Sequence, residues 1–288
     1  MMEHNAACFA SYMGLWAMLP ERLRAAFAHV RSGTIRAAVL GQPAGPPEER
    51  AYALVDNVAV IFIDGMTMKA DSKFGGTSTV RVRRALRDAM AEDAVDAILL
   101  RVDSPGGHVA GTMELADDVA AAASRKEVHA FGEDLMASAA YWAVSRASRI
   151  TANALAEVGS IGVYGVLVDE SQAAEMAGVK VHVVSSGPMK GAGHPGTEVT
   201  PEVLADVQTF VDAVSAEFFG AVRKGRKLSA GALAQVATGG TWIAPEAVGL
   251  GLLDAVGTWE DALRIASADG RGRRKRMSAA DRARRMGS

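Results

Sequence analysis

Short apolar runs that alternate with amphipathic segments are the feature that most constrains the fold of this chain. The runs at 58–63, 97–102 and 128–131 are almost wholly apolar and have the length of buried strands. Between the first two, residues 78–92 place apolar side chains at helical spacing, and a glycine turn at 105–107 leads into a second helical segment. Strands and helices that alternate in this way pair in parallel through right-handed crossovers. The sequence therefore predicts an α/β fold.

Further elements are predicted along the rest of the chain. Three more short apolar runs predict strands: 150–152, 162–168 and 181–185. Four more helices are predicted to begin at Ser138, Thr200, Ser229 and Ala244. The helix from Thr200 is the longest, because Thr200 suits the N-cap and Pro201 the first turn.

The two ends of the chain differ in composition from this core. Residues 1–50 include a predicted helix and a linker rich in proline and glycine, so we interpret them as an N-terminal arm. Residues 51–268 form one predicted domain. Eight basic residues crowd the remaining segment, 269–288, which predicts a disordered basic tail. Docking of this tail onto an acidic partner is the alternative.

Charge and cysteine content exclude several classes of protein. The 288 residues carry a formal net charge of −2, so neither nucleic acid nor a membrane surface is expected as the main partner. Cys8 is the one cysteine, which excludes an intrachain disulfide. The apolar stretch 7–19 is shorter than the roughly 20 residues of a membrane span, and no Lys or Arg precedes it as in a signal peptide. We therefore expect a cytoplasmic protein without a membrane span. Metal-ligand spacings are absent too, so no metal or cofactor is expected.

Ser138 and Lys190 are the candidate catalytic residues. Ser138 lies among small residues at a predicted strand–helix junction, which leaves its hydroxyl approachable. A serine becomes a nucleophile only when a base takes its proton, and a partly desolvated lysine can be that base. Lys190 lies in a loop of glycine and proline, and it is one of eight lysines against twenty-three arginines. Helix capping by Ser138 and a surface position for Lys190 are the alternatives.

Two further segments supply candidate supporting groups. Gly106 and Gly107 follow a predicted strand, where glycine lets backbone N–H groups approach an oxyanion. The N–H of Ala139 would complete an oxyanion hole with one of them. Ser160 would hold a lysine ammonium in place, as the third group that orients a base. An ordinary strand–helix turn and a turn serine are the respective alternatives.

The six histidines do not offer a better base. His108 and His194 would border the same cleft, whereas His129 and His182 fall inside predicted strands, where a packed or surface-facing ring is expected. None of them has the sequence setting of a triad base.

Four segments, taken in order, resemble the signal peptide peptidase A family of Ser-Lys peptidases, whose phage branch comprises the capsid-assembly proteases: 103–107, 137–142, 159–163 and 186–190. The resemblance covers about residues 55–265. It implies a fold related to caseinolytic protease and the crotonases, which is a spiral of β-β-α units. Residues 51–268 would then be a single peptidase domain.

The resemblance also implies a role for each candidate residue. Ser138 is the implied nucleophile, Lys190 the general base and Ser160 the hydroxyl that orients the lysine. Gly107 and Ala139 are the implied oxyanion donors. The family usually carries two glycines after the nucleophile, where this chain has two alanines, Ala139 and Ala140. Backbone N–H groups survive that change, although the turn becomes less permissive.

The leading hypothesis is a serine endopeptidase that cleaves scaffold or capsid proteins during phage or prophage head maturation, in the host cytoplasm or the prohead. An extended peptide would add as a strand near residues 107 and 162, so that Gly106, His108 and Gly162 contact substrate. Related enzymes form rings, so a homo-oligomer is implied. The alternatives are a cytoplasmic peptidase of signal peptides or small peptides, a crotonase-like acyl-CoA enzyme, and a structural assembly protein without activity.

Overall fold

The computed structural model describes three stretches of the chain, with side chains up to residue 279: 15–19, 51–71 and 76–286. The chain divides into two compact units, which we call unit 1 (residues 1–16 and 163–216) and unit 2 (residues 17–162 and 217–288). This differs from the single domain predicted over 51–268. Most of the predicted arm, with its helix, its linker and Cys8, lies outside the described residues.

The larger sheet of unit 2 is mostly parallel and confirms the predicted α/β class. Its strands are β2 (Ala53–Val55), β3 (Val58–Asp64), β6 (Ala97–Ser104), β8 (Glu127–Ala137), β9 (Arg149–Ala152), β10 (Glu157–Gly159), β11 (Thr241–Ile243) and β12 (Ala255–Val256). They lie in the order β11-β10-β8-β6-β3-β2, and β9 joins β8 to β12. The pairs β2–β3 and β10–β11 are antiparallel, and the other pairs are parallel. The structure thereby confirms the strands predicted at 58–63, 97–102, 128–131 and 150–152.

One face of this sheet packs against a C-terminal helix, α11 (Trp259–Met286). Leu99 of β6 and Phe131 of β8 are fully buried there, in one core cluster with Ala262 and Ala266 of α11. Trp259 meets Phe131 edge to face, with ring centroids 5.8 Å apart. Alternate strand residues point to the opposite face, because side chains alternate along a strand. The strand runs are therefore apolar throughout, as burial on both faces requires.

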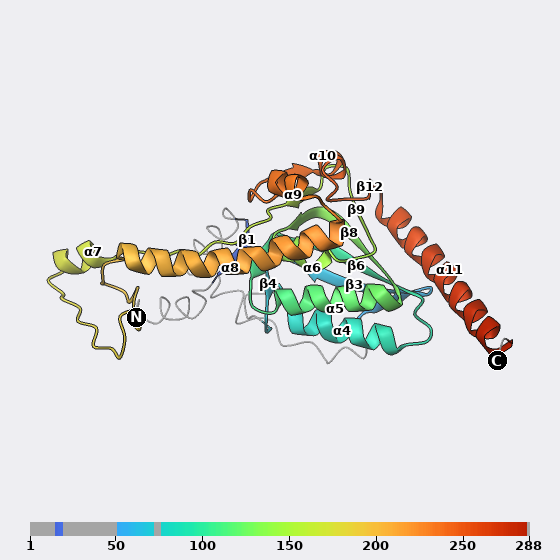
Figure 1. Ribbon diagram of the computed structural model, residues 1–288, viewed down its shortest axis with the longest axis horizontal. Helices are drawn as coiled ribbons and strands as arrows, with labels where there is room; N and C mark the ends of the chain where they lie inside the picture. The colour runs from blue at the N-terminus through green and yellow to red at the C-terminus, as the bar shows by residue number, and fades with distance from the viewer. Residues whose placement is uncertain (1–14, 20–50, 72–75, 287–288) are drawn as a thin grey trace, which may run out of the picture. The chain divides into compact units, whose positions relative to one another are not determined.

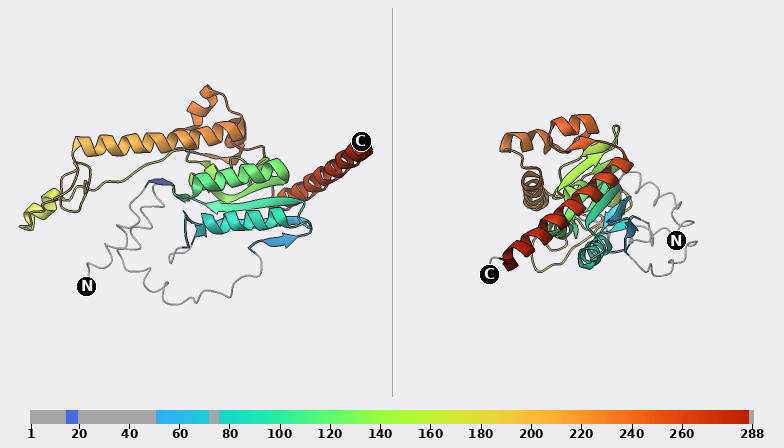
Figure 2. Two further views of the ribbon diagram at one scale, coloured as in Figure 1. Left: turned by 60° about the horizontal axis from the view of Figure 1, so that its bottom comes forward. Right: turned by 90° about the vertical axis from the view of Figure 1, so that its right-hand side faces the viewer.

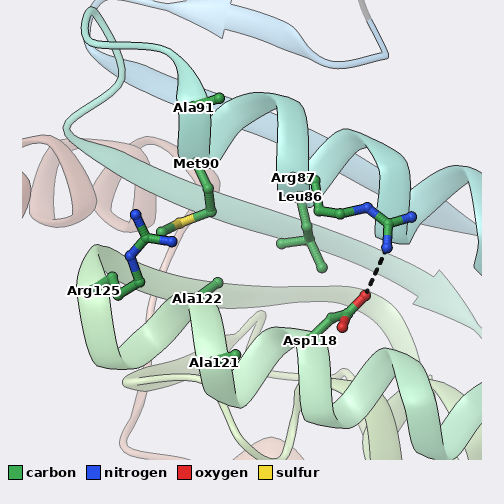
Figure 3. Close-up of a pocket in the computed structure, with 8 residues that line it drawn as sticks. All are labelled: Leu86, Arg87, Met90, Ala91, Asp118, Ala121, Ala122 and Arg125. Atoms are coloured by element: carbon green, nitrogen blue, oxygen red, sulfur yellow. Dashed lines mark ion pairs between the residues drawn. The ribbon is translucent and has the colours of Figure 1, made fainter.

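Helices α4 (Thr79–Ala91) and α5 (Thr112–Arg125) lie side by side along the sheet (Figures 1 and 2). The helical spacing predicted over 78–92 is confirmed, since Leu86 and Ala89 are buried. A hollow of about 270 Å³ remains between the two helices, with Leu86 and Met90 pointing into it (Figure 3). The ion pair of Arg87 with Asp118 crosses it at 3.8 Å. None of the candidate site residues lines this hollow.

A second, smaller sheet holds the glycine turn. It consists of β1 (Trp16–Met18), β4 (Thr67–Met68), β5 (Thr77–Ser78) and β7 (Gly106–His108), in the order β1-β7-β4-β5. Ser104, the last residue of β6, holds the turn into β7. Its hydroxyl donates to the carbonyl oxygen of Gly65 at 2.6 Å and accepts from the N–H of Gly106 at 3.2 Å.

The remaining helices confirm four predicted starts: α6 (Ala139–Val144), α8 (Pro201–Arg226), α9 (Ala230–Val236) and α10 (Ala244–Gly249). Helix α6 is wholly buried in unit 2. Trp142 of α6 stacks on Phe218 of α8, with centroids 4.6 Å apart and ring planes 6° from parallel. The hydroxyl of Tyr141 donates to the carbonyl oxygen of Leu252 at 2.8 Å. These contacts hold the helix that follows Ser138.

The predicted disordered tail over 269–288 is corrected by the structure, in which α11 continues to Met286. Two of its described basic residues, Arg273 and Arg274, have partners within the fold. Arg273 donates to the carbonyl oxygens of Ala123, at 3.2 Å, and Ser124, which lie in the last turn of α5. Arg274 pairs with Asp96 at 2.8 Å. Arginines suit a helix C-terminus because its last carbonyls lack partners. Neither α11 nor any other described helix is long and apolar enough to cross a membrane.

The strands predicted at 162–168 and 181–185 are wrong. In unit 1 the first run makes only an isolated bridge, between Tyr164 and Trp16, and the second carries no strand. Val184 is 98% exposed. An apolar run becomes a strand only where a neighbour can pair with its backbone, and the described part of unit 1 provides none for 181–185. The sequence also missed a short helix, α7 (Ser171–Met176).

Candidate active site

Ser138 lies on a sharp turn between β8 and α6. Its φ of 55° and ψ of −121° fall in a region that non-glycine residues rarely adopt. The turn is held by the N–H of Ser138, which donates to the carbonyl oxygen of Gly159 at 2.7 Å. The carbonyl oxygen of Ser138 accepts from the N–H of Trp142 at 2.8 Å, which starts the helix. Such strained strand–turn–helix corners are typical of nucleophilic serines.

The side chain of Ser138 is fully buried, and its hydroxyl has no hydrogen-bond partner among the described residues. It makes no capping bond to α6, which speaks against the capping alternative. A buried hydroxyl without a partner costs about 1–3 kcal/mol, so its environment is not that of a packing serine.

Gly106 and Gly107 lie directly against this serine turn and the adjoining strand. A β-carbon on Gly106 would lie 2.8 Å from Cβ of Ser138 and 2.9 Å from the nitrogen of Ala139. One on Gly107 would lie 1.9 Å from the carbonyl oxygen of Thr67. Only glycine fits at either position. The structure therefore brings Gly106 against Ser138 and Ala139, which lie more than thirty positions later in the sequence.

The role of Gly107 as an oxyanion donor stays a prediction. The N–H of Gly106 already bonds to the Ser104 hydroxyl. Sequence reasoning missed two supporting residues here. Ser104 lies inside the glycine segment 103–107, so the motif itself could have indicated that its hydroxyl holds the turn by hydrogen bonds. Thr67 carried no sequence signal, and its buried hydroxyl has no partner among the described residues.

Ser160 leaves the adjacent parallel strand at the same level as Ser138. β10 pairs with β8 so that Gly159 lies opposite Ala137, and each strand ends one residue before its serine. Ser160 is buried and has a positive φ of 52°, and its N–H donates to the carbonyl oxygen of Gly240 at 2.7 Å. The two serines therefore occupy equivalent corners on neighbouring strands.

Lys190 lies in unit 1, whereas Ser138 and Ser160 lie in unit 2. The side chain of Lys190 is exposed. The backbone N–H of Lys190 donates to the carbonyl oxygen of Gly187 at 3.0 Å. Lys190 lines a groove of about 390 Å³ in unit 1 together with Glu198 and Glu202. The pairing of Lys190 with Ser138 stays a prediction.

The residues expected to contact substrate differ in their surroundings. His108 is half-buried at the end of β7, where its Nδ1 accepts from the N–H of Ala110 at 3.0 Å, and burial lowers its pKa. Gly162 lies two residues after Ser160 and packs against Gly239. Partial burial, with Asp134 and Glu133 nearby, raises the pKa of Asp103 at the end of β6.

Three more histidines lie within the described residues. Burial lowers the pKa of His129, whose Nε2 lies 3.5 Å from a carboxylate oxygen of Asp269 on α11. His182 and His194 are not buried, and both lie in unit 1. Within the described residues, no group of three His, Cys, Asp or Glu side chains could hold a metal ion.

A strained, buried serine at the end of a parallel strand, beside a glycine strand, defines an α/β protein with a site of the serine-hydrolase type. Comparison with known families is consistent with this class. The chain belongs to peptidase family S49, whose profile matches residues 120–271. The matched stretch includes Ser138, Ser160 and Lys190.

Several curated proteins are similar to this chain. It is 30% identical to capsid assembly protease C of Escherichia phage lambda, over 79% of this chain and 53% of that protein. It is 30% identical to protease 4 of Salmonella typhi, over 72% of this chain and 33% of that protein. It is 31% identical to head-tail preconnector protein GP5 of Enterobacteria phage P21, over 60% of this chain and 36% of that protein. The chain thus spans about half the length of these relatives or less.

A solved structure is also similar. The ClpP protease catalytic domain of Plasmodium falciparum aligns with 69% of this chain and 85% of that chain, with a TM-score of 0.42 and 11% sequence identity.

Proposed function

We propose that the chain is a serine endopeptidase in which Ser138 is the nucleophile. The observation that carries this proposal is the state of Ser138, which is buried, strained and without a hydroxyl partner in the described residues. A positive φ at a non-glycine residue costs about 1–3 kcal/mol, and such strain persists where the site needs it. The family to which the chain belongs supports the same chemistry.

In the proposed mechanism, the Ser138 hydroxyl attacks the carbonyl carbon of the scissile peptide bond. Lys190, in its neutral form, takes the hydroxyl proton, and Ser160 orients the lysine. The N–H groups of Gly107 and Ala139 receive the negative oxygen of the tetrahedral intermediate. Lys190 then returns the proton to the leaving amine, and water hydrolyses the acyl-enzyme.

We propose that the substrates are scaffold or capsid polypeptides, processed in the host cytoplasm or the prohead. The names of two relatives, a capsid assembly protease and a head-tail preconnector protein, support this class over a general peptidase. The test is incubation of the purified chain with the products of any scaffold or capsid genes that lie beside its own. Specific, Ser138-dependent cleavage of one of them is the expected result, and resistance of all of them would contradict this substrate class.

We also infer that the chain forms homo-oligomers. Unit 1 exposes several large apolar side chains that a second copy would cover: Val166, Val168, Met176, Val179, Val183, Val184 and Met189. Light scattering of the Ser138→Ala chain after gel filtration should give a mass of at least two times 30.0 kDa. A monomer at micromolar concentration would contradict this inference.

Labelling with a fluorophosphonate probe tests the nucleophile. The wild-type chain should be labelled at Ser138 and should release peptides from casein, and Ser138→Ala should do neither. Ser145→Ala is the matched control, because Ser145 is also fully buried beside α6 and its hydroxyl merely donates to the carbonyl oxygen of Trp142 at 2.8 Å. Casein hydrolysis that survives in Ser138→Ala would overturn the proposal.

Lys190→Ala tests the base. Loss of a general base typically slows the reaction by about 10²–10⁴-fold, so labelling should slow by at least about 100-fold. An unchanged rate in Lys190→Ala would show that another group takes the proton.

A further inference from the structure

The short strand β1 lies where the proposed substrate strand would bind. It is the neighbour of β7, the glycine strand, at the edge of the smaller sheet. Leu19, which follows β1, donates its N–H to the carbonyl oxygen of Pro105 at 3.1 Å. Main-chain pairing of this kind is how an extended peptide adds to a sheet edge. The chain's own segment thus occupies the edge that an added peptide would need.

The carbonyl group of Ala17 lies at the serine turn. A β-carbon on Gly106 would lie 2.3 Å from the carbonyl oxygen of Ala17, and the same point is 2.8 Å from Cβ of Ser138 and 2.9 Å from the nitrogen of Ala139. The carbonyl oxygen, the serine and the first N–H of α6 therefore converge. A scissile carbonyl needs this neighbourhood, with the nucleophile on one side and an N–H donor for its oxygen.

The residues beside Ala17 have buried side chains and a hydrogen-bonded backbone, as a bound substrate peptide would have. The side chains of Ala17, Met18 and Leu19 are buried, with exposures of 0, 2 and 5%. Leu19 packs in one apolar cluster with Leu135 and Ala137, the strand residues that lead into Ser138. Within unit 1, Trp16 exchanges two main-chain hydrogen bonds with Tyr164, at 2.9 and 3.0 Å. The segment is held through its backbone and through fitted side chains.

We propose that the chain is its own substrate, and that Ser138 cuts the peptide bond between Ala17 and Met18. This inference rests on the proposed function. The Ser138 oxygen forms an ester bond to the carbonyl carbon of Ala17, and its proton passes through the base to the nitrogen of Met18 as the carbon–nitrogen bond breaks. Water then hydrolyses the ester, which releases residues 1–17 and restores the hydroxyl. Met18 becomes the new amino terminus.

Tethering makes this cleavage intramolecular and also blocks the site until it occurs. A bond held beside its nucleophile reacts as a unimolecular step, so the rate should not depend on protein concentration. An added polypeptide cannot pair with β7 while β1 does. Casein hydrolysis should therefore show a lag that ends as the chain is processed.

The test follows the intact mass of the purified full chain over time. We expect loss of residues 1–17, an amino terminus at Met18, and a first-order rate that is the same across a tenfold range of protein concentration. Ser138→Ala should remain intact. Met18→Pro should slow cleavage of this bond by about 100-fold or more, because a proline nitrogen misplaces the bond relative to the nucleophile. Met18→Leu, which keeps the N–H and the apolar side chain, is the matched control and should be processed like the wild type.

Fluorophosphonate labelling, run to completion, separates this proposal from the proposed function. If Ser138 is labelled but the chain stays intact or is cut only at another bond, self-cleavage is wrong and the peptidase assignment stands. If Ser138 is not labelled and no cleavage occurs, both are wrong. Loss of residues 1–17 in Ser138→Ala would also overturn self-cleavage, because another enzyme would then have made the cut.

Discussion

Two glycines of α8 should respond in opposite directions to the same substitution. Gly220 is exposed, and a β-carbon there would meet no atom within 4 Å. Gly225 faces the end of α6, where a β-carbon would lie 2.0 Å from the carbonyl oxygen of Ser145 and 2.8 Å from its carbonyl carbon. Alanine is favoured over glycine inside a helix by about 0.5–1 kcal/mol. Gly220→Ala should therefore stabilise the protein by that amount.

Gly225→Ala should destabilise it. Atoms cannot approach to 2.0 Å, so α8 and α6 must move apart, and the contact is with backbone, which cannot rotate away. Overpacking of this kind costs about 1–3 kcal/mol. The helix preference of alanine over glycine offsets only part of this cost. We therefore expect a net loss of about 1–2 kcal/mol in the free energy of unfolding.

Urea denaturation followed by tryptophan fluorescence measures both changes. The midpoint should rise for Gly220→Ala and fall for Gly225→Ala, with unchanged slopes. Gly225→Ala should also slow Ser138 labelling, since α6 carries the serine turn at its other end. A Gly225→Ala midpoint equal to or above that of Gly220→Ala would refute the packing of α8 on α6.

Three further changes test other parts of the fold. Burial alone would raise the pKa of Asp254, but hydrogen bonding to Arg226 and to a backbone N–H outweighs burial and lowers this pKa. This contribution to stability is present above the unfolded Asp pKa of about 3.9 and is lost as pH falls through the lowered value, so Asp254→Asn should flatten the fall in urea midpoint towards pH 3. Phe218→Ala removes the ring stacked on Trp142 and should cost about 3–5 kcal/mol in urea unfolding, without changing the charge. Arg273→Ala removes the bonds to the end of α5 and should speed amide exchange in residues 268–279, whereas equal exchange would contradict the packing of α11.

The basic end of the chain shows why part of the fold could not be predicted from the sequence. A run of arginines near a terminus predicts a solvent-exposed segment, because its composition does not indicate which residues it would contact in the fold. Here the partners of Arg273 lie about 150 residues earlier, at the end of α5. The apolar run at 181–185 failed for the opposite reason. Its composition suits a strand, but strand formation needs a paired neighbour, and composition does not state whether one is present.

The sequence by itself determined the α/β class, the order of the strands and helices in the core, and the family. Periodicity reports burial locally, and the glycine and serine segments have the residue types that their turns require. Only the tertiary structure decided which of those segments meet. The strained conformation of Ser138 depends on a backbone bond to Gly159, and its closeness to Gly106 depends on a second sheet. The approach of Ala17 to the same point had no signal in the sequence, because contacts between distant segments arise only when the sheets assemble.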